Sequence, residues 1–411
     1  MTPPSEQVPS LWRHRPFLQY FASRSLSELA YQIATVAVGW QIYALTHSAL
    51  NLGIAGLVQF APSALLMFFA GHAADRYPRN RVVLVCSMLE GAAAAYLAWS
   101  TFSGHVTVGA IYAALAVFGV ASAFDSPASA ALLPAVTSEE QLQRGTALST
   151  GSWQFAAITG PAAGGLLYAI APCAPYLVMF ALSLSSAVLI ATLKMRTSVR
   201  LKESPTLATL FAGVVFVRHN PAILGTISLD LFAVLLGGAT ALLPVYASDI
   251  LHTGVWGLGV LRAVPSLGAL LMTAVLAHYT ITRRAGLRMF QAVIVFGLAT
   301  VVFGVCRQMW LAIVALAIMG AADTVSVVVR ASLVQLATPD AMRGRVSAVN
   351  YLFINASNQL GAFESGVAAA LLGAVPAVVL GGIGSVAVAL LWMKLFPTLR
   401  RVDRLDGALL R

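Results

Sequence analysis

The chain has 411 residues, of which 59% are hydrophobic and only 10% are charged, and its formal net charge is +10. A soluble protein of this length would form two or three domains with frequently interrupted apolar segments, whereas here long apolar runs follow one another almost without pause. The mean hydropathy of +0.83 is typical of a polytopic membrane protein. The basic residues lie in alternate loops and not on one amphipathic face, so the positive charge indicates membrane topology and not nucleic-acid binding.

Twelve apolar segments are each near the ~20 residues that a helix needs to cross a bilayer, and we predict them as membrane spans. In chain order they are 17–45, 50–71, 82–101, 106–133, 142–170, 175–193, 221–251, 256–278, 287–306, 309–337, 346–373 and 375–396. The first run carries Arg24 and Glu28 and is too long for a signal peptide, so we expect it to be a retained span.

The basic residues predict the orientation of these spans. Almost all arginines and lysines fall in loops on one side, and the loops on the other side hold only Arg307. By the positive-inside rule, both termini are expected in the cytoplasm. An odd number of spans would mix the two kinds of loop, so the charge pattern favours an even number.

The longest polar connection, residues 194–220, divides the chain into an N-terminal bundle (1–193) and a C-terminal bundle with a basic tail (221–411). The two parts echo each other at an offset of roughly 200 residues, as expected for parallel transporter repeats. The echo pairs Asp125, Leu133, Thr137, Arg144 and Gly145 with Asp323, Leu333, Thr338, Arg343 and Gly344. We therefore expect a polar cavity near mid-membrane, between two six-helix bundles.

Ionisable residues inside predicted spans are costly in lipid and usually face a cavity or a partner. In the first span, Arg24, Glu28, Gln32 and Thr35 recur every three to four residues and share one helical face. Asp230 in the seventh span lies at nearly the same depth as Glu28. Two alternatives remain open for Glu28, namely proton or cation handling and a structural ion pair with Arg24.

Spans 8, 10 and 11 carry further ionisable residues that are candidates for proton coupling or for the substrate cavity. Asp323 and Arg330 lie two turns apart on one face of span 10, where a mutual or cross-helix salt bridge is the structural alternative. Glu364 has no basic residue near it in sequence, which suits either proton exchange or a hydrogen-bonded structural role. The proton-coupling candidates are Glu28, Asp230, Glu364 and Asp323, and the substrate-cavity candidates are Arg24, Gln32, Arg262 and Arg330.

A basic segment joins spans 2 and 3. Its notable residues are Gly71, Asp75, Arg76, Arg79 and Arg81. Asp75 is suited to accept hydrogen bonds at a helix N-terminus such as that of span 11. The arginines are suited to pair with Asp125, Asp340 or lipid phosphates and so to close the cytoplasmic side, although a purely topogenic loop is an alternative.

Small residues mark span 5. Gly160, Pro161, Gly164 and Gly165 let a neighbouring helix approach closely and bend the backbone. Elsewhere the sequence contains no phosphate-binding loop, hydrolase motif or metal-ligand cluster, so we expect neither an enzyme nor a cofactor.

These motifs together resemble the major facilitator superfamily. The segment Gly-x-x-x-Asp-Arg-x-x-Arg-x-Arg from Gly71 to Arg81 is similar to the family's loop between helices 2 and 3, with Pro78 as a departure. Gly160 to Gly165 resemble the Gly-Pro-x-x-Gly-Gly segment of drug/proton antiporters. Residues 124–128 and 338–346 resemble the enterobactin-exporter, or transmembrane-secretion-effector, branch.

The resemblance implies an all-α protein of twelve transmembrane helices in two six-helix bundles. It implies a bacterial inner-membrane exporter of a siderophore or drug-like molecule, driven by proton antiport with alternating access. The expected partners are a small-molecule substrate, protons and membrane lipid, without nucleic acid, and we expect a monomer. A proton-coupled importer or symporter, and a non-transporting scaffold or sensor, are the alternatives.

Overall fold

The computed structural model describes residues 11, 14–193, 214–279 and 283–402, and within these ranges the chain is helical without a strand. The first half contains the long helices of the N-terminal bundle. They are α1 (Arg15–Thr46), α2 (Ala49–Arg76), α3 (Arg79–Phe102), α4 (Val108–Val136), α5 (Glu139–Ile170) and α6 (Ala174–Ala191). These helices pack mainly on one another, with α2 against α4, α3 against α6 and α1 against both α5 and α6.

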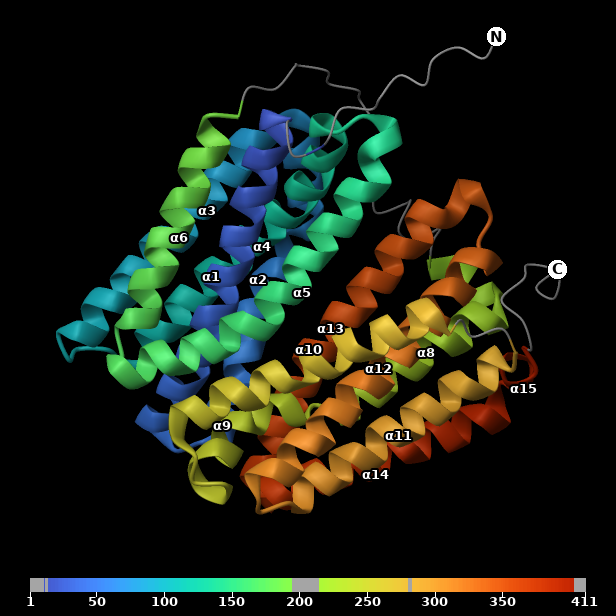
Figure 1. The fold of residues 1–411 in the computed structure, drawn as a ribbon. Coiled ribbons are helices and arrows are strands. Elements are labelled where there is room, and N and C mark those ends of the chain that lie inside the picture. The colour runs from blue at the N-terminus through green and yellow to red at the C-terminus, as the bar shows by residue number, and fades with distance from the viewer. Residues whose placement is uncertain (1–10, 12–13, 194–213, 280–282, 403–411) are drawn as a thin grey trace, which may run out of the picture.

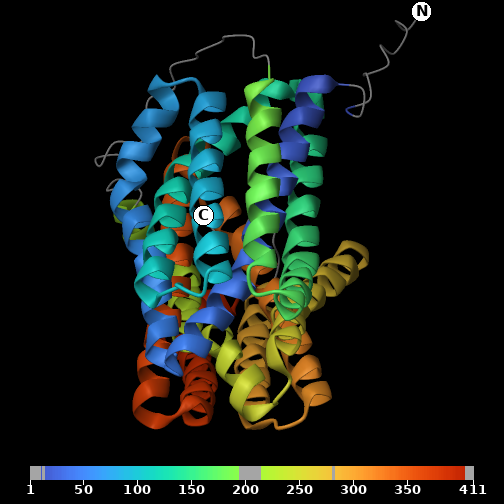
Figure 2. The ribbon, with the colours of Figure 1, turned by 90° about the vertical axis from the view of Figure 1, so that its left-hand side faces the viewer.

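The second half repeats this arrangement with one broken helix. Its elements are α8 (Pro221–Leu236), η2 (Ala239–Leu242), α9 (Leu243–Val245), η3 (Tyr246–Ile250), α10 (Gly254–His278), α11 (Ala285–Val305), α12 (Met309–Ala337), α13 (Asp340–Leu372), α14 (Ala374–Leu395) and α15 (Pro397–Arg400). Figures 1 and 2 show two helical bundles that meet at one end and diverge toward the end where each bundle's first helix begins.

Local signals explain where several helices begin and end. The Thr107 side chain accepts a hydrogen bond from the amide of Ala110 and caps α4, and Asn220 caps α8 in the same way through the amide of Ile223. His47 adopts a left-handed conformation (φ 46°) at the end of α1, and its amide bonds the Tyr43 carbonyl. The left-handed residue His47 allows the chain to turn from α1 into α2 within two residues.

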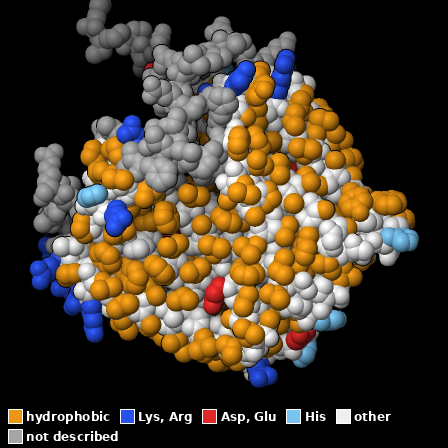
Figure 3. Space-filling model, turned by 180° about the vertical axis from the view of Figure 1, so that it is seen from behind, with side chains coloured by type: hydrophobic (Ala, Val, Ile, Leu, Met, Phe, Trp, Pro, Cys, Tyr) orange, Lys and Arg blue, Asp and Glu red, His pale blue; other side chains and the backbone are white. Residues whose placement is uncertain are grey.

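Nine helical segments in the described ranges are long and apolar enough to cross a membrane. The long helices outside this set are α1, α5 and α13, which carry more polar residues than the others. Figure 3 shows apolar side chains over most of one face of the molecule, with lysines and arginines gathered mainly at its edges. This distribution is that of a protein whose outer surface lies in lipid and whose polar helices face inward.

The structure corrects two predictions about segment boundaries. The seventh span is not one continuous helix, because α8 gives way to a 3₁₀ turn and then to a π-helical turn before Ile250. The basic segment after span 2 is mostly helix and not a loop, since α2 runs to Arg76, α3 begins at Arg79 and only Tyr77 and Pro78 separate them. An apolar run does not reveal a change of helical winding within it, and a helix that projects into water loses hydrophobicity before it loses helical structure.

Glycines set the spacing between helices at several crossings. A Cβ atom built on Gly268 of α10 would lie 2.1 Å from the carbonyl oxygen of Ala317 in α12, well inside van der Waals contact. A Cβ atom built on Gly320 of α12 would lie 2.0 Å from the carbonyl oxygen of Pro265 in α10. Helices α10 and α12 therefore contact each other backbone to backbone, as small residues permit in membrane proteins.

We predict that Gly268→Ala lowers the stability of the purified protein by about 1–3 kcal/mol, because the methyl group must push α10 away from α12. Gly151→Ala in α5 is the matched control, since a Cβ there meets nothing within 4 Å. The measurement is thermal unfolding in detergent, followed by tryptophan fluorescence. Equal unfolding temperatures for Gly268→Ala and Gly151→Ala would contradict this account of the α10–α12 contact.

Candidate functional site

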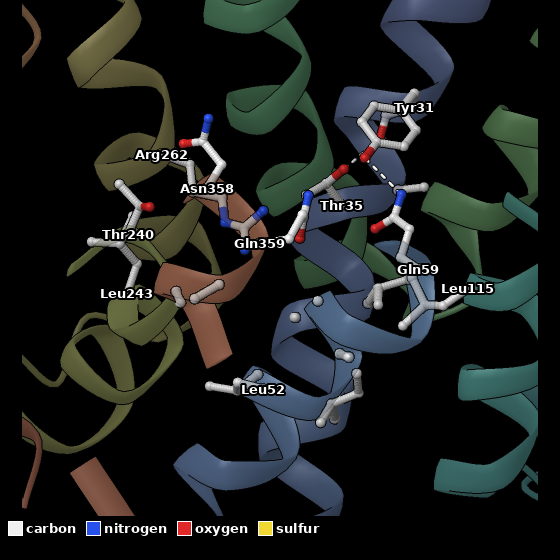
Figure 4. Close-up of a pocket in the computed structure, with 18 of the residues that line it drawn as sticks. Tyr31, Thr35, Leu52, Gln59, Leu115, Thr240, Leu243, Arg262, Asn358 and Gln359 are labelled. Carbon is white, nitrogen blue, oxygen red and sulfur yellow. Dashed lines mark hydrogen bonds between the residues drawn. The ribbon is translucent and has the colours of Figure 1, made fainter. Parts of the chain in front are cut away.

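A cavity of about 430 Å³ lies between the two halves. Helices α1, α2, α4, α9, α10 and α13 and the turn η2 supply its walls. Figure 4 shows Tyr31, Thr35, Gln59 and Leu115 of the first half on one side and Thr240, Leu243 and Arg262 of the second half on the other. The volume lies within the range of small-molecule sites in proteins, roughly 300–1,000 Å³.

The cavity wall combines apolar surface with a few polar groups. The Tyr31 hydroxyl accepts a hydrogen bond from Gln59 Nε2 at 2.8 Å, which ties α1 to α2. The apolar part of the wall comes from Val38, Ile42, Leu52, Leu115, Phe118 and Leu243, and the polar part from Tyr31, Thr35, Gln59, Thr240, Arg262, Ser266, Asn358 and Gln359. Such a wall suits an organic molecule that has both apolar surface and hydrogen-bonding groups.

Arg262 is the one charged side chain among the described residues that line the cavity. Its guanidinium reaches across from α10, so that a Cβ built on Gly39 of α1 would lie 3.2 Å from Nη2. Its Nε is buried and has no hydrogen-bond partner in the described part of the chain. The cavity therefore presents a cation without a counter-charge in its wall.

Beyond one end of the cavity, the glycines of α5 bring the two halves close together. A Cβ on Gly165 would lie 2.8 Å from the Val255 carbonyl and 3.1 Å from Gly259 Cα in α10. A Cβ on Gly164 would lie 2.5 Å from the Ile33 carbonyl, so this segment packs α5 against α1 of its own half and against α10 of the other half. The segment thus brings the two halves into backbone contact.

A second close contact between the halves, that of α2 with α13, lies at the same end. A Cβ on Gly366 would lie 2.9 Å from Gly53 Cα, and one on Gly53 would lie 3.1 Å from the Phe363 backbone. Nearby, the Tyr43 hydroxyl donates a short hydrogen bond to the Asp249 carboxylate and links α1 to η3. These contacts lie where α1, α5 and α13 end and α2 and α10 begin, which is opposite the end from which each bundle starts.

A charge cluster joins α1 to α4 in the first half. Arg24 Nε bonds Glu28 Oε1 at 2.7 Å, and Arg24 Nη1 bonds Asp125 Oδ2 at 2.8 Å. Glu28 Oε2 is buried and has no hydrogen-bond partner in the described residues. The cluster therefore contains two carboxyl groups and one guanidinium, and one carboxylate oxygen is left without a donor.

The second half holds an ion pair between the corresponding helices. Arg330 of α12 pairs with Asp230 of α8, and both residues are buried. In the first half the arginine lies on the first helix and the aspartate on the fourth, whereas in the second half these positions are exchanged. Each bundle is thus braced across the same two helices by one arginine–aspartate pair.

These ion pairs place several sequence candidates outside the cavity wall. Arg24, Glu28, Asp230 and Arg330 are engaged in the two pairs and do not line the cavity. Arg330 pairs with Asp230 across helices, and the half-buried Asp323 two turns earlier is not its partner. Of the four substrate-cavity candidates, only Arg262 lines the cavity.

Two further candidates lie in helix contacts near the cavity. A Cβ on Gly160 of α5 would lie 2.4 Å from the Cβ of Gln32, so Gln32 faces a neighbouring helix and not the cavity. Glu364 is half-buried in α13, two residues beyond the cavity-lining Ala362. Neither residue therefore belongs to the wall of this cavity.

The basic segment does not make the predicted contact with Asp125. Asp125 is held by Arg24 and by the Ser129 hydroxyl at 3.1 Å, and Arg79 Nη1 instead donates to the Ala131 carbonyl at 2.9 Å. Of the partners considered for these arginines, Asp125 is paired with Arg24 of α1 in this structure. The surroundings of Gly71 and of the Asp75 and Asp340 side chains are not described by the structure. Arg76 is exposed.

Sequence reasoning missed most polar residues of the cavity wall. Thr35 was on the predicted polar face of α1, but Tyr31, Gln59, Asn358 and Gln359 were not singled out. The available signal was the presence of carboxamides inside apolar spans, which is uncommon unless they face a cavity or another polar group.

A polar cavity between two membrane-embedded helical bundles that contact each other at one end is the arrangement of a polytopic transporter of small molecules. The family model described as Major Facilitator Superfamily matches residues 20–362 of this chain. The chain belongs to the Major Facilitator Superfamily.

Curated relatives resemble the chain over nearly its whole length. It is 27% identical over 397 residues to the enterobactin exporter EntS of Citrobacter koseri, covering 94% of this chain and 93% of that protein. It is 26% identical, with the same coverage, to the enterobactin exporter EntS of Escherichia coli O139:H28.

Solved structures share the fold at low sequence identity. A bacterial homologue of the iron transporter ferroportin, in an inward-facing state, gives a TM-score of 0.70 at 17% identity and covers 94% of this chain and 99% of that chain. A bacterial homologue of the lysosomal transporter Spinster, in an inward-facing and occupied conformation, gives 0.74 at 12% identity and covers 94% and 97%. These likenesses confirm the predicted major facilitator fold.

We predict that Asp230→Asn destabilises the protein by about 3–5 kcal/mol, because it leaves the buried Arg330 guanidinium without a counter-charge. The double variant Asp230→Asn/Arg330→Gln removes the orphaned charge and is expected to recover most of this loss. Thermal unfolding of the three proteins in one detergent measures the effect. A double variant no more stable than Asp230→Asn would contradict a structural role for this ion pair.

Proposed function

We propose that this protein is a secondary active transporter that exports a siderophore-like or drug-like small molecule across the bacterial inner membrane. The observation that carries the proposal is a cavity lined by both halves, which also meet through glycine backbone contacts at one end of the molecule. A cavity of this kind gives a substrate access to one side of the membrane at a time, which is the requirement for alternating access. The relatives named as enterobactin exporters favour export and a siderophore-type substrate.

The orientation that we propose follows the basic residues. Arg76, Arg79 and Lys394 lie at the end of the molecule opposite the glycine contacts, as do the beginning of α1 and the end of α14. With this end in the cytoplasm, by the positive-inside rule, both termini and the connection 194–220 are cytoplasmic. The cavity is then closed toward the periplasm and faces the cytoplasm, which suits loading by an exporter. On this division, residues 1–193 and 221–411 form the two moving bundles.

For the opposite state to form, we propose that three contacts between the halves break. The backbone contacts of Gly165 and Gly53 and the bond from Tyr43 to Asp249 all join the two halves at the proposed periplasmic end. Rocking of the halves would separate these contacts and bring the cytoplasmic ends together. The basic segment from Gly71 to Arg81, with Asp75, is our proposed cytoplasmic contact in that second state.

Proton exchange is proposed at the α1–α4 charge cluster. Its two carboxyl groups share one arginine, and Glu28 Oε2 accepts no hydrogen bond, so a proton on Glu28 would remove the excess negative charge and lower the cost of burying this oxygen. Asp230 is matched one-to-one with Arg330 and is a weaker candidate on this reasoning. Asp323 and Glu364 stay candidates by their position in the spans.

The proposed function is tested with the purified protein in inside-out proteoliposomes. Enterobactin, the compound for which the relatives are named, and a panel of hydrophobic dyes are added outside, and an acidic lumen supplies the proton gradient. We expect accumulation in the lumen that collapses with a protonophore. Accumulation driven by an alkaline lumen would favour the alternative of a symporter or importer, and no gradient-linked movement of any compound would favour a scaffold or sensor.

For the coupling residue, we predict that Glu28→Gln reduces gradient-driven accumulation at least tenfold, because the amide cannot release a proton. Substrate exchange across the membrane without a gradient should persist, since the cavity wall is untouched. Glu140→Gln, which alters an exposed glutamate at the start of α5, is the matched control and should leave both activities unchanged. Undiminished gradient-driven accumulation in Glu28→Gln would remove this residue from the proton route.

A further inference from the structure

The cavity wall carries one positive charge that nothing in the described structure neutralises. The three ion pairs of the described residues use Arg24 and Arg330, and Arg262 takes part in none of them. Arg262 is half-buried and its Nε is fully buried without a partner, and such a cation is costly unless hydrogen bonds or an opposite charge replace the water it has lost. The expected replacement is an anion that enters the cavity.

The other lining residues point to the same conclusion. The described wall contains no aspartate or glutamate, so the negative groups at Glu28, Asp125, Asp230 and Glu364 lie outside it. An organic cation would meet only like charge at Arg262 and would find no carboxylate in the wall. An anion would find an attractive charge in a partly apolar enclosure, where electrostatic attraction is stronger than in bulk water.

The placement of Arg262 also fits recognition of a planar oxoanion. Its guanidinium approaches α1 near Gly39, while Gln59, Asn358 and Gln359 bring carboxamides to the same cavity (Figure 4). A guanidinium presents donors in a rigid fork that matches carboxylate or sulfonate oxygens. Gln59 and Asn358 each donate one amide hydrogen, to Tyr31 and to the Ile354 carbonyl respectively, and their second hydrogen is a further donor. Phe118, Leu115 and Ile42 then cover the apolar body of the molecule.

We propose that the cavity selects amphipathic organic molecules carrying one anionic group, and that Arg262 is the residue that binds this group. The inference deepens the proposed export function by naming the charge class of its substrate. It concerns binding to the cavity, so it is tested without a gradient and without transport.

The probes are 2-naphthoate and 2-naphthamide, which share one aromatic body and differ in charge. Binding of each to the full-length protein in nanodiscs is measured by isothermal titration calorimetry, with empty nanodiscs as the blank. We expect the wild-type protein to bind 2-naphthoate at least tenfold more tightly than 2-naphthamide. Arg262→Gln should abolish this preference by weakening the acid while leaving the amide nearly unchanged.

Two variants separate charge recognition from a structural effect. Arg262→Lys keeps the positive charge without the planar fork and should retain part of the preference. Arg307→Gln removes an equal charge from an exposed position between α11 and α12 and should retain all of it. A purely structural Arg262 would instead change the affinity for both probes equally.

Three results would overturn the inference. They are no measurable binding of 2-naphthoate to the wild-type protein, equal affinity for the two probes, and a preference that survives in Arg262→Gln. The outcome is separate from that of the proposed function, because selective binding of the acid without gradient-driven accumulation would leave the binding role of Arg262 intact and refute only export.

Discussion

The cost of burying charge governs where the ionisable side chains in the core of this protein lie. Each half contains one arginine–aspartate pair, in which one residue lies on the first helix of that half and the other on the fourth. Such a pair repays desolvation only when its geometry is held by the surrounding helices, so it favours one arrangement of the bundle over others. The same brace is therefore kept in both halves, although the arginine lies on the first helix in one half and on the fourth helix in the other.

Glycine contacts complement these pairs by joining the halves where charge is absent. At Gly165, Gly259, Gly53 and Gly366 the backbones of opposite halves approach to distances that a side chain would prevent. Contacts of this kind depend on dispersion and shape and contain no buried salt bridge that must be broken. Ion pairs thus brace the helices within each half, whereas the halves meet through glycine backbone contacts and the Tyr43–Asp249 hydrogen bond.

The sequence was sufficient for the fold because its information is carried by long apolar runs and alternating basic loops. It also located the Arg24–Glu28 pair, since residues four apart on a helix are neighbours. The cross-helix partners Asp125 and Arg330 were known only as candidates, because the rotation of each helix about its axis decides which charges meet. For the same reason Gln59 and Asn358 escaped notice, and only Arg262 among the predicted cavity residues lines the cavity.

The seventh crossing differs from its counterpart α1, which is continuous over 32 residues. Between Leu236 and Ile250 the winding of the chain changes from α to 3₁₀ and then to π, beside the cavity-lining Thr240 and the Tyr43–Asp249 bond. A helix with uneven winding absorbs twist and changes of length locally, without displacing its two ends. The second half thus has an irregularly wound segment beside the cavity, at the place where the first half has the continuous helix α1.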